Sequence, residues 1–148
     1  MKFTAQSGFT LVELMIVLVI IAIVVAITSM SVLAARVQAN EGQAKAALNA
    51  IASAVEMYRN TQGVYPDSLT ILGSDYVGPD LVAGQKSGYA FAAAAGTSTD
   101  LQLTATGTPS VSTGATQTGA RFFFTDETQV VRFAVGAAAT STSGAIGN

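Results

Sequence analysis

The 148-residue sequence predicts an α+β fold in which one long N-terminal helix packs against a small antiparallel sheet of three or four strands. The helix is predicted because Gly42 is the only glycine between Gly8 and Gly63, and the first proline is Pro66, so no helix breaker interrupts the segment. The sheet is predicted because apolar residues after Gly88 alternate with polar ones or form short runs between turn residues. We therefore expect the strands to form a meander that covers one face of the helix.

The first half of the predicted helix is apolar on all sides. Every residue from Leu14 to Ile27 is apolar, and one carboxylate, Glu13, precedes this run. The run falls within the roughly 7 to 15 residues of a signal-peptide core and short of the roughly 20 residues of a membrane span. Counted from Phe9 it is long enough to span a bilayer, with Glu13 inside the hydrocarbon or at its edge. Because an ionisable group there is costly, Glu13 is a candidate functional residue; the alternative is a carboxylate that interacts with the positive end of the helix dipole.

The residues around Glu13 resemble the N-terminus of type IV pilins and of type II secretion pseudopilins. That signature is a short polar leader ending in glycine, then Phe-Thr-Leu-x-Glu, then an apolar helix. Here the leader is residues 1–8, and Phe9-Thr10-Leu11-Val12-Glu13 follows it. The resemblance implies that a prepilin peptidase cleaves after Gly8, that the new amine of Phe9 is methylated, and that Glu13 takes part in assembling the subunits into a helical filament.

The same resemblance implies a division of the chain into three segments. Residues 1–8 are the leader, residues 9–36 are the transmembrane and filament-core helix, and residues 37–148 are a periplasmic or extracellular pilin head. The precursor would lie in the inner membrane, in contact with the lipid bilayer before assembly, and would meet an inner-membrane assembly platform. The product would be a homo-oligomeric filament at the cell surface or across the periplasm. Charge does not fix the orientation, because Lys2 precedes the apolar run and Arg36 follows it.

Two other interpretations stay open. The filament is either a pilus or the pseudopilus of a type II secretion system. Alternatively, a signal peptidase cuts near Ala34-Ala35, and the remainder is a secreted or membrane-tethered adhesin module. The mass of the released protein separates the last interpretation from the others, because a cut after Gly8 keeps the apolar helix and a cut near Ala35 removes it.

The second half of the predicted helix is amphipathic and ends near Asn60. Its apolar residues recur at helical spacing and form one predicted core face: Leu33, Val37, Ala44, Leu48, Ile51, Val55 and Tyr58. On the polar side, Glu41 and Lys45 are predicted to form an i,i+4 ion pair. Gly63 is the predicted αL cap, and Pro66 prevents the helix from resuming.

The head is predicted to contain one short turn, a connection and the strands. Asp67 is the predicted cap of a turn over residues 68–72, and residues 73–88 are predicted to be rich in loops. The predicted strands are residues 89–93, 101–106, 121–125 and 129–135, of which the last two form a hairpin. Residues 107–119 are predicted to be an exposed Ser/Thr/Gly-rich loop, and residues 136–148 a loose tail.

The composition excludes most catalytic and metal chemistry. The chain has no Cys and no His, which rules out disulfides, thiol chemistry, imidazole acid–base catalysis and the usual zinc sites. A net charge of −2, with 11% charged residues, gives no footprint for nucleic acid. Asp75 and Asp80 are candidates for a calcium site, but residues 136–148 lack the carboxylates of the C-terminal calcium loop found in some pseudopilins. The sequence therefore predicts no enzyme, no cofactor and no metal.

Overall fold

The computed structural model describes residues 8–95 and 103–146, with the side chains of residues 27–31, 95, 103 and 104 left undescribed. The chain divides into two compact units, Met1–Ala34 and Ala35–Asn148, and each is described by itself. Most of the predicted leader, residues 1–7, lies outside the described residues, as do residues 101–102 of the second predicted strand and residues 147–148 of the tail.

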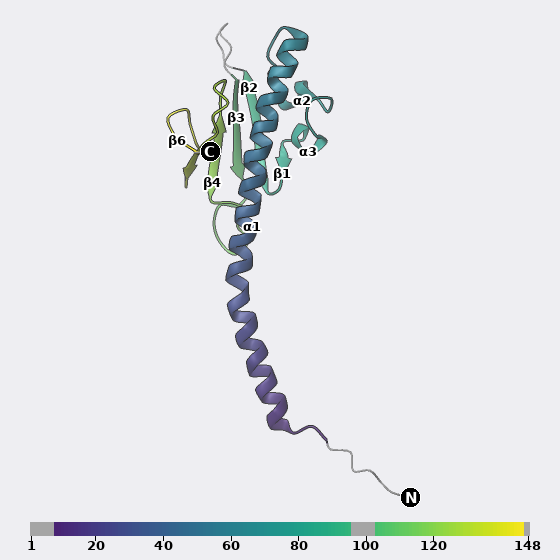
Figure 1. The fold of residues 1–148 in the computed structure, drawn as a ribbon, viewed down its shortest axis with the longest axis vertical. Coiled ribbons are helices and arrows are strands. Elements are labelled where there is room, and N and C mark those ends of the chain that lie inside the picture. Colours follow the sequence, from purple (N-terminus) through teal and green to yellow (C-terminus); the bar gives the residue numbers. More distant parts are fainter. Residues whose placement is uncertain (1–7, 96–102, 147–148) are drawn as a thin grey trace, which may run out of the picture. The chain divides into compact units, whose positions relative to one another are not determined.

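The long helix α1 extends from Leu11 to Gln62 as one continuous helix (Figure 1). This confirms the predicted helix, with each end within two or three residues of the expected position. Gly63 follows it with φ +78, and its N–H donates to the Arg59 carbonyl at 2.7 Å, so the predicted αL cap is confirmed.

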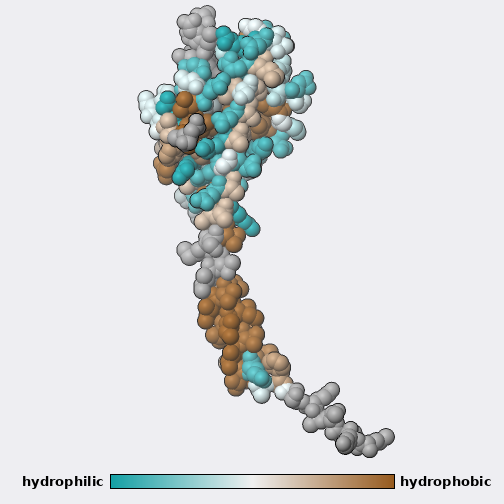
Figure 2. Space-filling view, in the orientation of Figure 1, coloured by the Kyte–Doolittle hydropathy of each residue, from teal (hydrophilic) through white to brown (hydrophobic). Residues whose placement is uncertain are grey.

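In the first unit the apolar side chains of α1 are exposed. Every side chain from Leu11 to Ala26 is accessible, and Figure 2 shows them as a continuous hydrophobic surface with one hydrophilic patch near the start of the helix. No helix among the described residues has both the length and the apolar character needed to cross a membrane.

In the second unit the apolar face of α1 forms the core. Ala44, Leu48, Ile51 and Val55 are fully buried, as their spacing predicts. They cluster with buried residues of the sheet, chief among them Tyr89 and Phe123. Leu33 and Val37, which belong to the same predicted face, are only half-buried. The first fully buried residue of this face, Ala44, therefore lies about three helical turns after Leu33, where the sequence pattern begins.

The sheet is an antiparallel meander in the order β1-β2-β3-β4-β5-β6. Its strands in the described residues are β1 (Gln85–Lys86), β2 (Tyr89–Ala95), β3 (Leu103–Pro109), β4 (Arg121–Thr125), β5 (Arg132–Val135) and β6 (Gly144–Ala145). The prediction of three or four strands matches the four longer ones. The two edge strands, β1 and β6, have two residues each, which is too short to leave a periodic pattern in the sequence.

Three local predictions about the sheet and its tail were wrong. The first three residues of the predicted loop 107–119 still belong to β3, where Gly107 pairs with Phe91 and Phe123. A Cβ at Gly107 would lie 3.2 Å from the Phe91 ring, so glycine is needed for close packing there. The tail is not loose, since the Ile146 N–H donates to the Val131 carbonyl at 2.9 Å and β6 pairs with β5. Strand β5 starts at Arg132, three residues later than predicted.

The connection between α1 and the sheet contains two short helices, α2 (Leu69–Leu72) and α3 (Pro79–Val82). Ser68, not Asp67, caps α2, because its Oγ accepts a hydrogen bond from the Ile71 N–H at 3.3 Å. Leu69, Leu72 and Leu81 join the core cluster, which explains why this segment is folded rather than a simple loop.

Candidate assembly site at the N-terminus of α1

Glu13 and Thr10 bind each other at the start of α1. The Glu13 Oε2 atom accepts hydrogen bonds from the Thr10 N–H at 2.9 Å and from the Thr10 hydroxyl at 2.8 Å. The Thr10 Oγ1 atom accepts one in return from the Glu13 N–H at 3.2 Å. This reciprocal arrangement is a capping box, which satisfies two N–H groups that the first turn of a helix leaves without partners. The sequence analysis did not single out Thr10, although the spacing Thr-x-x-Glu is the signal that identifies such a box.

The two residues of the predicted cleavage junction lie just before the helix. Gly8 and Phe9 are outside α1 and exposed, and 79% of the Phe9 surface is accessible. A Cβ built on Gly8 would meet nothing within 4 Å, so the peptide between them is open on that side. In the uncleaved chain the nitrogen of Phe9 is an amide and carries no charge. The Glu13 carboxylate is held instead at the N–H of Thr10, one residue further along.

Among the residues that the structure describes, no cationic side chain pairs with Glu13. In the described ranges, the two ion pairs join Arg59 with Glu56 and Arg121 with Glu41. The first Lys or Arg after Glu13 is Arg36, more than six helical turns along the chain. Within the described residues, Glu13 therefore interacts with dipoles from Thr10 and from the start of the helix, and with no charged side chain.

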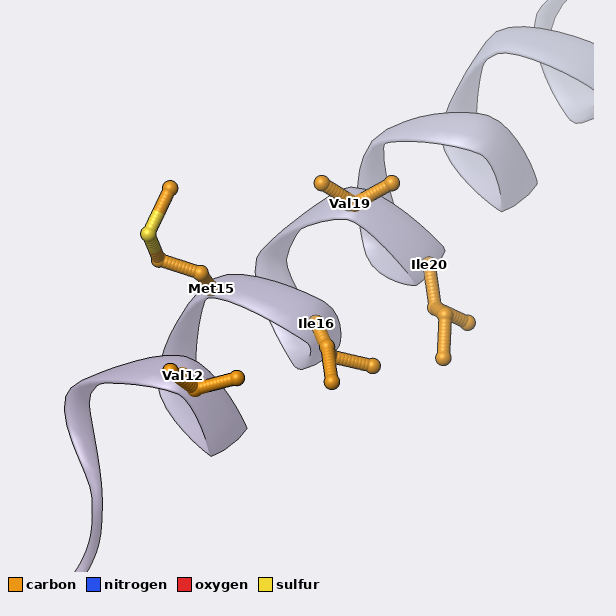
Figure 3. Close-up of a pocket in the computed structure, with 5 residues that line it drawn as sticks. All are labelled: Val12, Met15, Ile16, Val19 and Ile20. Carbon is orange, nitrogen blue, oxygen red and sulfur yellow. The ribbon is translucent and has the colours of Figure 1, made fainter.

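An apolar groove follows directly after the capping box. It has a volume of about 250 Å³ and is lined by Val12, Met15, Ile16, Val19 and Ile20. In Figure 3, Met15 and Val19 project on one side, and Ile16 and Ile20 on the other. Each pair is four residues apart, so the side chains form two parallel ridges with a groove between them, which is the surface that a second helix packs into.

Three features that were considered in the sequence are not part of this site. Glu41 does not pair with Lys45 as predicted, because its Oε2 atom lies 3.6 Å from Arg121 Nε, and its Oε1 atom accepts from the Ala120 and Arg121 N–H groups. Asp75 and Asp80 are exposed. Within the described residues, no three acidic side chains lie together as a metal site would require.

Comparison with known proteins points to one group. Residues 3–29 match the family described as the prokaryotic N-terminal methylation motif. The type IV major pilin protein PilA of Myxococcus xanthus is 34% identical over 131 residues, which cover 85% of this chain and 57% of that protein. The type II secretion system core protein G of Pseudomonas aeruginosa is 41% identical over 63 residues, which cover 43% of this chain and 44% of that protein.

The chain thus spans about half the length of the curated relatives it matches. No solved structure matches it. The methylation motif, which contains Gly8, Phe9 and Glu13, and the two relatives agree with each other and with the long N-terminal helix. The chain contains the prokaryotic N-terminal methylation motif and is similar to type IV pilins and type II secretion pseudopilins.

Proposed function

We propose that the chain is a structural subunit of a type IV pilus-like filament, cleaved after Gly8 and polymerised through its N-terminal helix. The observation that carries this proposal is the exposed apolar surface of residues 11–26, which contains one carboxylate and a groove shaped for another helix. Exposed apolar surfaces of this extent mark interaction sites, because the area removed from water supplies the driving force. Other copies of the same helix provide matching ridges.

In the assembled filament, the carboxylate of Glu13 would require a positively charged partner. In a bundle of apolar helices, an unpaired carboxylate costs several kcal/mol. Cleavage after Gly8 would create an ammonium group at Phe9, and methylation of that amine keeps its charge. This ammonium is the partner that the described side chains do not supply. The ammonium group that pairs with Glu13 belongs either to the same chain or to a neighbouring subunit offset along the filament axis. A pair between neighbouring subunits would set their offset along the axis and would make assembly depend on cleavage.

The location and partners follow from the proposed assembly. Before assembly, residues 9–36 would lie in the inner-membrane bilayer and residues 37–148 on its outer side. A prepilin peptidase would remove residues 1–8, and an assembly platform in the same membrane would add subunits to the filament. The role is structural, so no catalytic residue is assigned.

A surface pilus is favoured over a secretion pseudopilus. The match to the major pilin covers 85% of this chain and so includes the head, whereas the match to the secretion protein covers 43%. The second match keeps the pseudopilus as an alternative, because its identity is higher over the part that it covers. Imaging of cells that lack the protein separates the two, since loss of surface filaments is expected only for a pilus.

The decisive experiment uses strains in which the variant is the only subunit. We expect Glu13→Gln to be inserted and cleaved after Gly8 but to form few filaments, because an uncharged amide does not neutralise the buried ammonium. Glu127→Gln is the matched control, since Glu127 is exposed on the head and the change in charge is the same. Mass spectrometry of the mature chain checks cleavage, and electron microscopy measures filaments.

Normal filament yield from cleaved Glu13→Gln would remove the charge-pair mechanism and leave Glu13 as a helix-capping residue. A mature mass that corresponds to a cut near Ala35 would contradict the filament proposal itself and support the adhesin alternative.

A further inference from the structure

The head contains a small polar cavity that the proposed assembly of α1 does not use. Its volume is about 230 Å³, and its lining residues are Lys45, Asn49, Gln129, Val130, Val131 and Ile146. Lys45 and Asn49 are one turn apart on α1, so their side chains share a face. Gln129 to Val131 come from the turn between β4 and β5, and Ile146 follows β6. The cavity therefore joins the helix to the edge of the sheet formed by β5 and β6.

The backbone of Gln129 indicates that its side chain is needed there. Gln129 has φ +58, and its N–H donates to the Asp126 carbonyl at 2.9 Å, which closes the turn. Glycine adopts this left-handed conformation without steric cost, whereas glutamine is disfavoured in it. Turn geometry alone would select glycine. A glutamine at this position is explained if its amide contributes to the cavity, and strained residues of this kind gather at functional sites.

The charge of Lys45 is left without a counterion in the described part of the chain. The ion pairs found there involve Glu41 and Glu56, and Glu41 is occupied by Arg121. Of the two acidic residues in the nearby turn, Asp126 binds the Thr128 N–H and hydroxyl, and Glu127 is exposed. The cavity thus offers one ammonium group, two amides and three aliphatic walls. That set fits a carboxylate carried by a short protein segment.

The head itself carries such a segment on its other side. Asp75 lies between α2 and α3, and Asp80 lies in the first turn of α3; the segment Asp75–Asp80 is called the acidic loop below. Both carboxylates are exposed, and neither takes part in the ion pairs of the described residues. Figure 1 shows α2 and α3 on one side of α1, and β4 and β6 on the other. One molecule therefore presents the acidic loop and the lysine cavity on opposite sides.

We propose that the Lys45 cavity of one copy binds the loop Asp75–Asp80 of a second copy. Two different surfaces meet in such a contact, so it is heterologous, and a heterologous contact that does not close into a ring generates a helical filament. The inference rests on the proposed filament function and adds to it a contact between heads. This contact would fix the rotation between neighbouring subunits by charge, whereas the apolar helices alone leave that rotation weakly specified.

Cysteine cross-linking tests the contact directly, because the chain has no native Cys. Asn49→Cys is combined with Asp75→Cys or, separately, with Asp80→Cys, and assembled filaments of the full chain are mildly oxidised. A ladder of covalent dimers, trimers and longer species from either pair is expected, and none from the single-Cys variants. Filaments that give no ladder with either pair, or that stop at dimers, would overturn the proposed contact.

Charge reversal gives an independent measurement. Lys45→Glu should lower filament yield at least about tenfold, because it places like charges opposite each other. Adding Asp75→Lys and Asp80→Lys to the same chain should restore the yield. Lys86→Glu is the matched control. It changes the net charge by the same amount, but Lys86 lies in β1, beside the acidic loop and not in the Lys45 cavity. Unchanged yield from Lys45→Glu, as expected if the cavity binds only a small free carboxylate, would overturn the proposal.

Gln129→Gly separates the role of the cavity from that of the fold. It relieves the positive φ, so the melting temperature of the full chain in detergent should stay the same or rise, while filament yield falls. Wild-type yield from this variant would count against a binding role for the Gln129 amide. Filaments that form without the head contact leave the filament function intact, whereas failure of the processed wild-type chain to form any filament contradicts the proposed function itself.

Discussion

The two halves of α1 differ in what happens to their apolar side chains. In the first half, Ile16, Ile20 and the other large side chains keep about half or more of their surface accessible. In the second half, Leu48, Ile51 and Val55 are completely buried against the strands of the head. The second half of α1 is thus covered by strands of its own chain. The apolar side chains of the first half are not covered by other parts of the described structure, and for this reason we expect their partner to be another molecule.

The two carboxylates near the beginning of these halves, Glu13 and Glu41, differ in the same way. Glu41 is buried and is held by Ala120 and Arg121, which lie about eighty positions later in the sequence. Glu13 is bound by Thr10, three positions earlier. Glu41 therefore ties the helix to β4 within one subunit. Glu13 closes its own helical turn and keeps no long-range partner among the described side chains.

The largest expected effect is on the buried half. Ile51→Ala removes a fully enclosed side chain and should lower the free energy of unfolding of the head by about 2–5 kcal/mol. Ile20→Ala is the matched control in the exposed half, where the same truncation should change that quantity by less than about 0.5 kcal/mol. Urea unfolding of the full chain in detergent, followed by near-ultraviolet circular dichroism of its tyrosines, measures both. Equal effects would show that the two halves are not packed differently.

The next effect concerns Glu41. Glu41→Gln keeps the shape but removes the charge that strengthens two backbone hydrogen bonds and the contact with Arg121, so we expect a loss of about 1.5–3 kcal/mol. Glu127→Gln, at an exposed position with the same change of charge, should cost less than about 0.5 kcal/mol. If both variants unfold at the same urea concentration, Glu41 does not tie α1 to β4.

Sequence periodicity predicted the parts of the fold that repeat. The spacing of Ala44, Leu48, Ile51 and Val55 identified the core face, because a helix places such residues on one side. The hairpin of β4 and β5 was predicted for a similar reason, although β5 begins later than expected. Elements of two residues, such as β1 and β6, have no period to detect. Gly107 lies within β3 because of packing against Phe91, and no local signal shows this.

For the candidate sites too, the sequence reveals features formed by neighbouring residues and misses those formed by residues far apart in the chain. Gly8, Phe9 and Glu13 were chosen as candidates because their motif is contiguous in the sequence, and their roles in cleavage and assembly stay predictions. The capping role of Thr10 is visible in the spacing Thr-x-x-Glu, although it was missed. The partner of Glu41 was predicted wrongly as Lys45, because i,i+4 spacing is visible in a sequence and a strand eighty residues away is not. The cavity beside Lys45 likewise depends on a tertiary contact, between α1 and residues 129–131 and 146, so the sequence alone did not suggest it.

The smallest effect, and the one with a pH dependence, concerns Tyr89 of β2, which belongs to the same core cluster as the buried half of α1. Tyr89 is fully buried, and its hydroxyl donates to the Arg121 carbonyl at 2.9 Å. Burial, assisted by the negative charge of Glu41 and opposed by Arg121, raises the pKa of the Tyr89 phenol above its usual value. In the unfolded chain the phenol ionises near pH 10, whereas in the folded chain it stays protonated to higher pH. The folded state then binds more protons, so stability is retained below about pH 10 and falls as pH rises beyond it.

Tyr89→Phe should therefore have an effect that depends on pH. At neutral pH we expect it to lower the free energy of unfolding by about 1 kcal/mol, because one hydrogen bond is lost and the Arg121 carbonyl loses a donor. Above about pH 10 the phenol ionises in the unfolded wild type but not in the folded one, which lowers the stability of the wild type alone. The difference in the free energy of unfolding between the two proteins should therefore shrink and then reverse. Urea unfolding of both proteins from pH 7 to about pH 11 measures this. Parallel stability profiles over that range would show that Tyr89 ionises as freely in the folded head as in the unfolded chain, and the buried half of α1 would then be less tightly enclosed than its exposure values indicate.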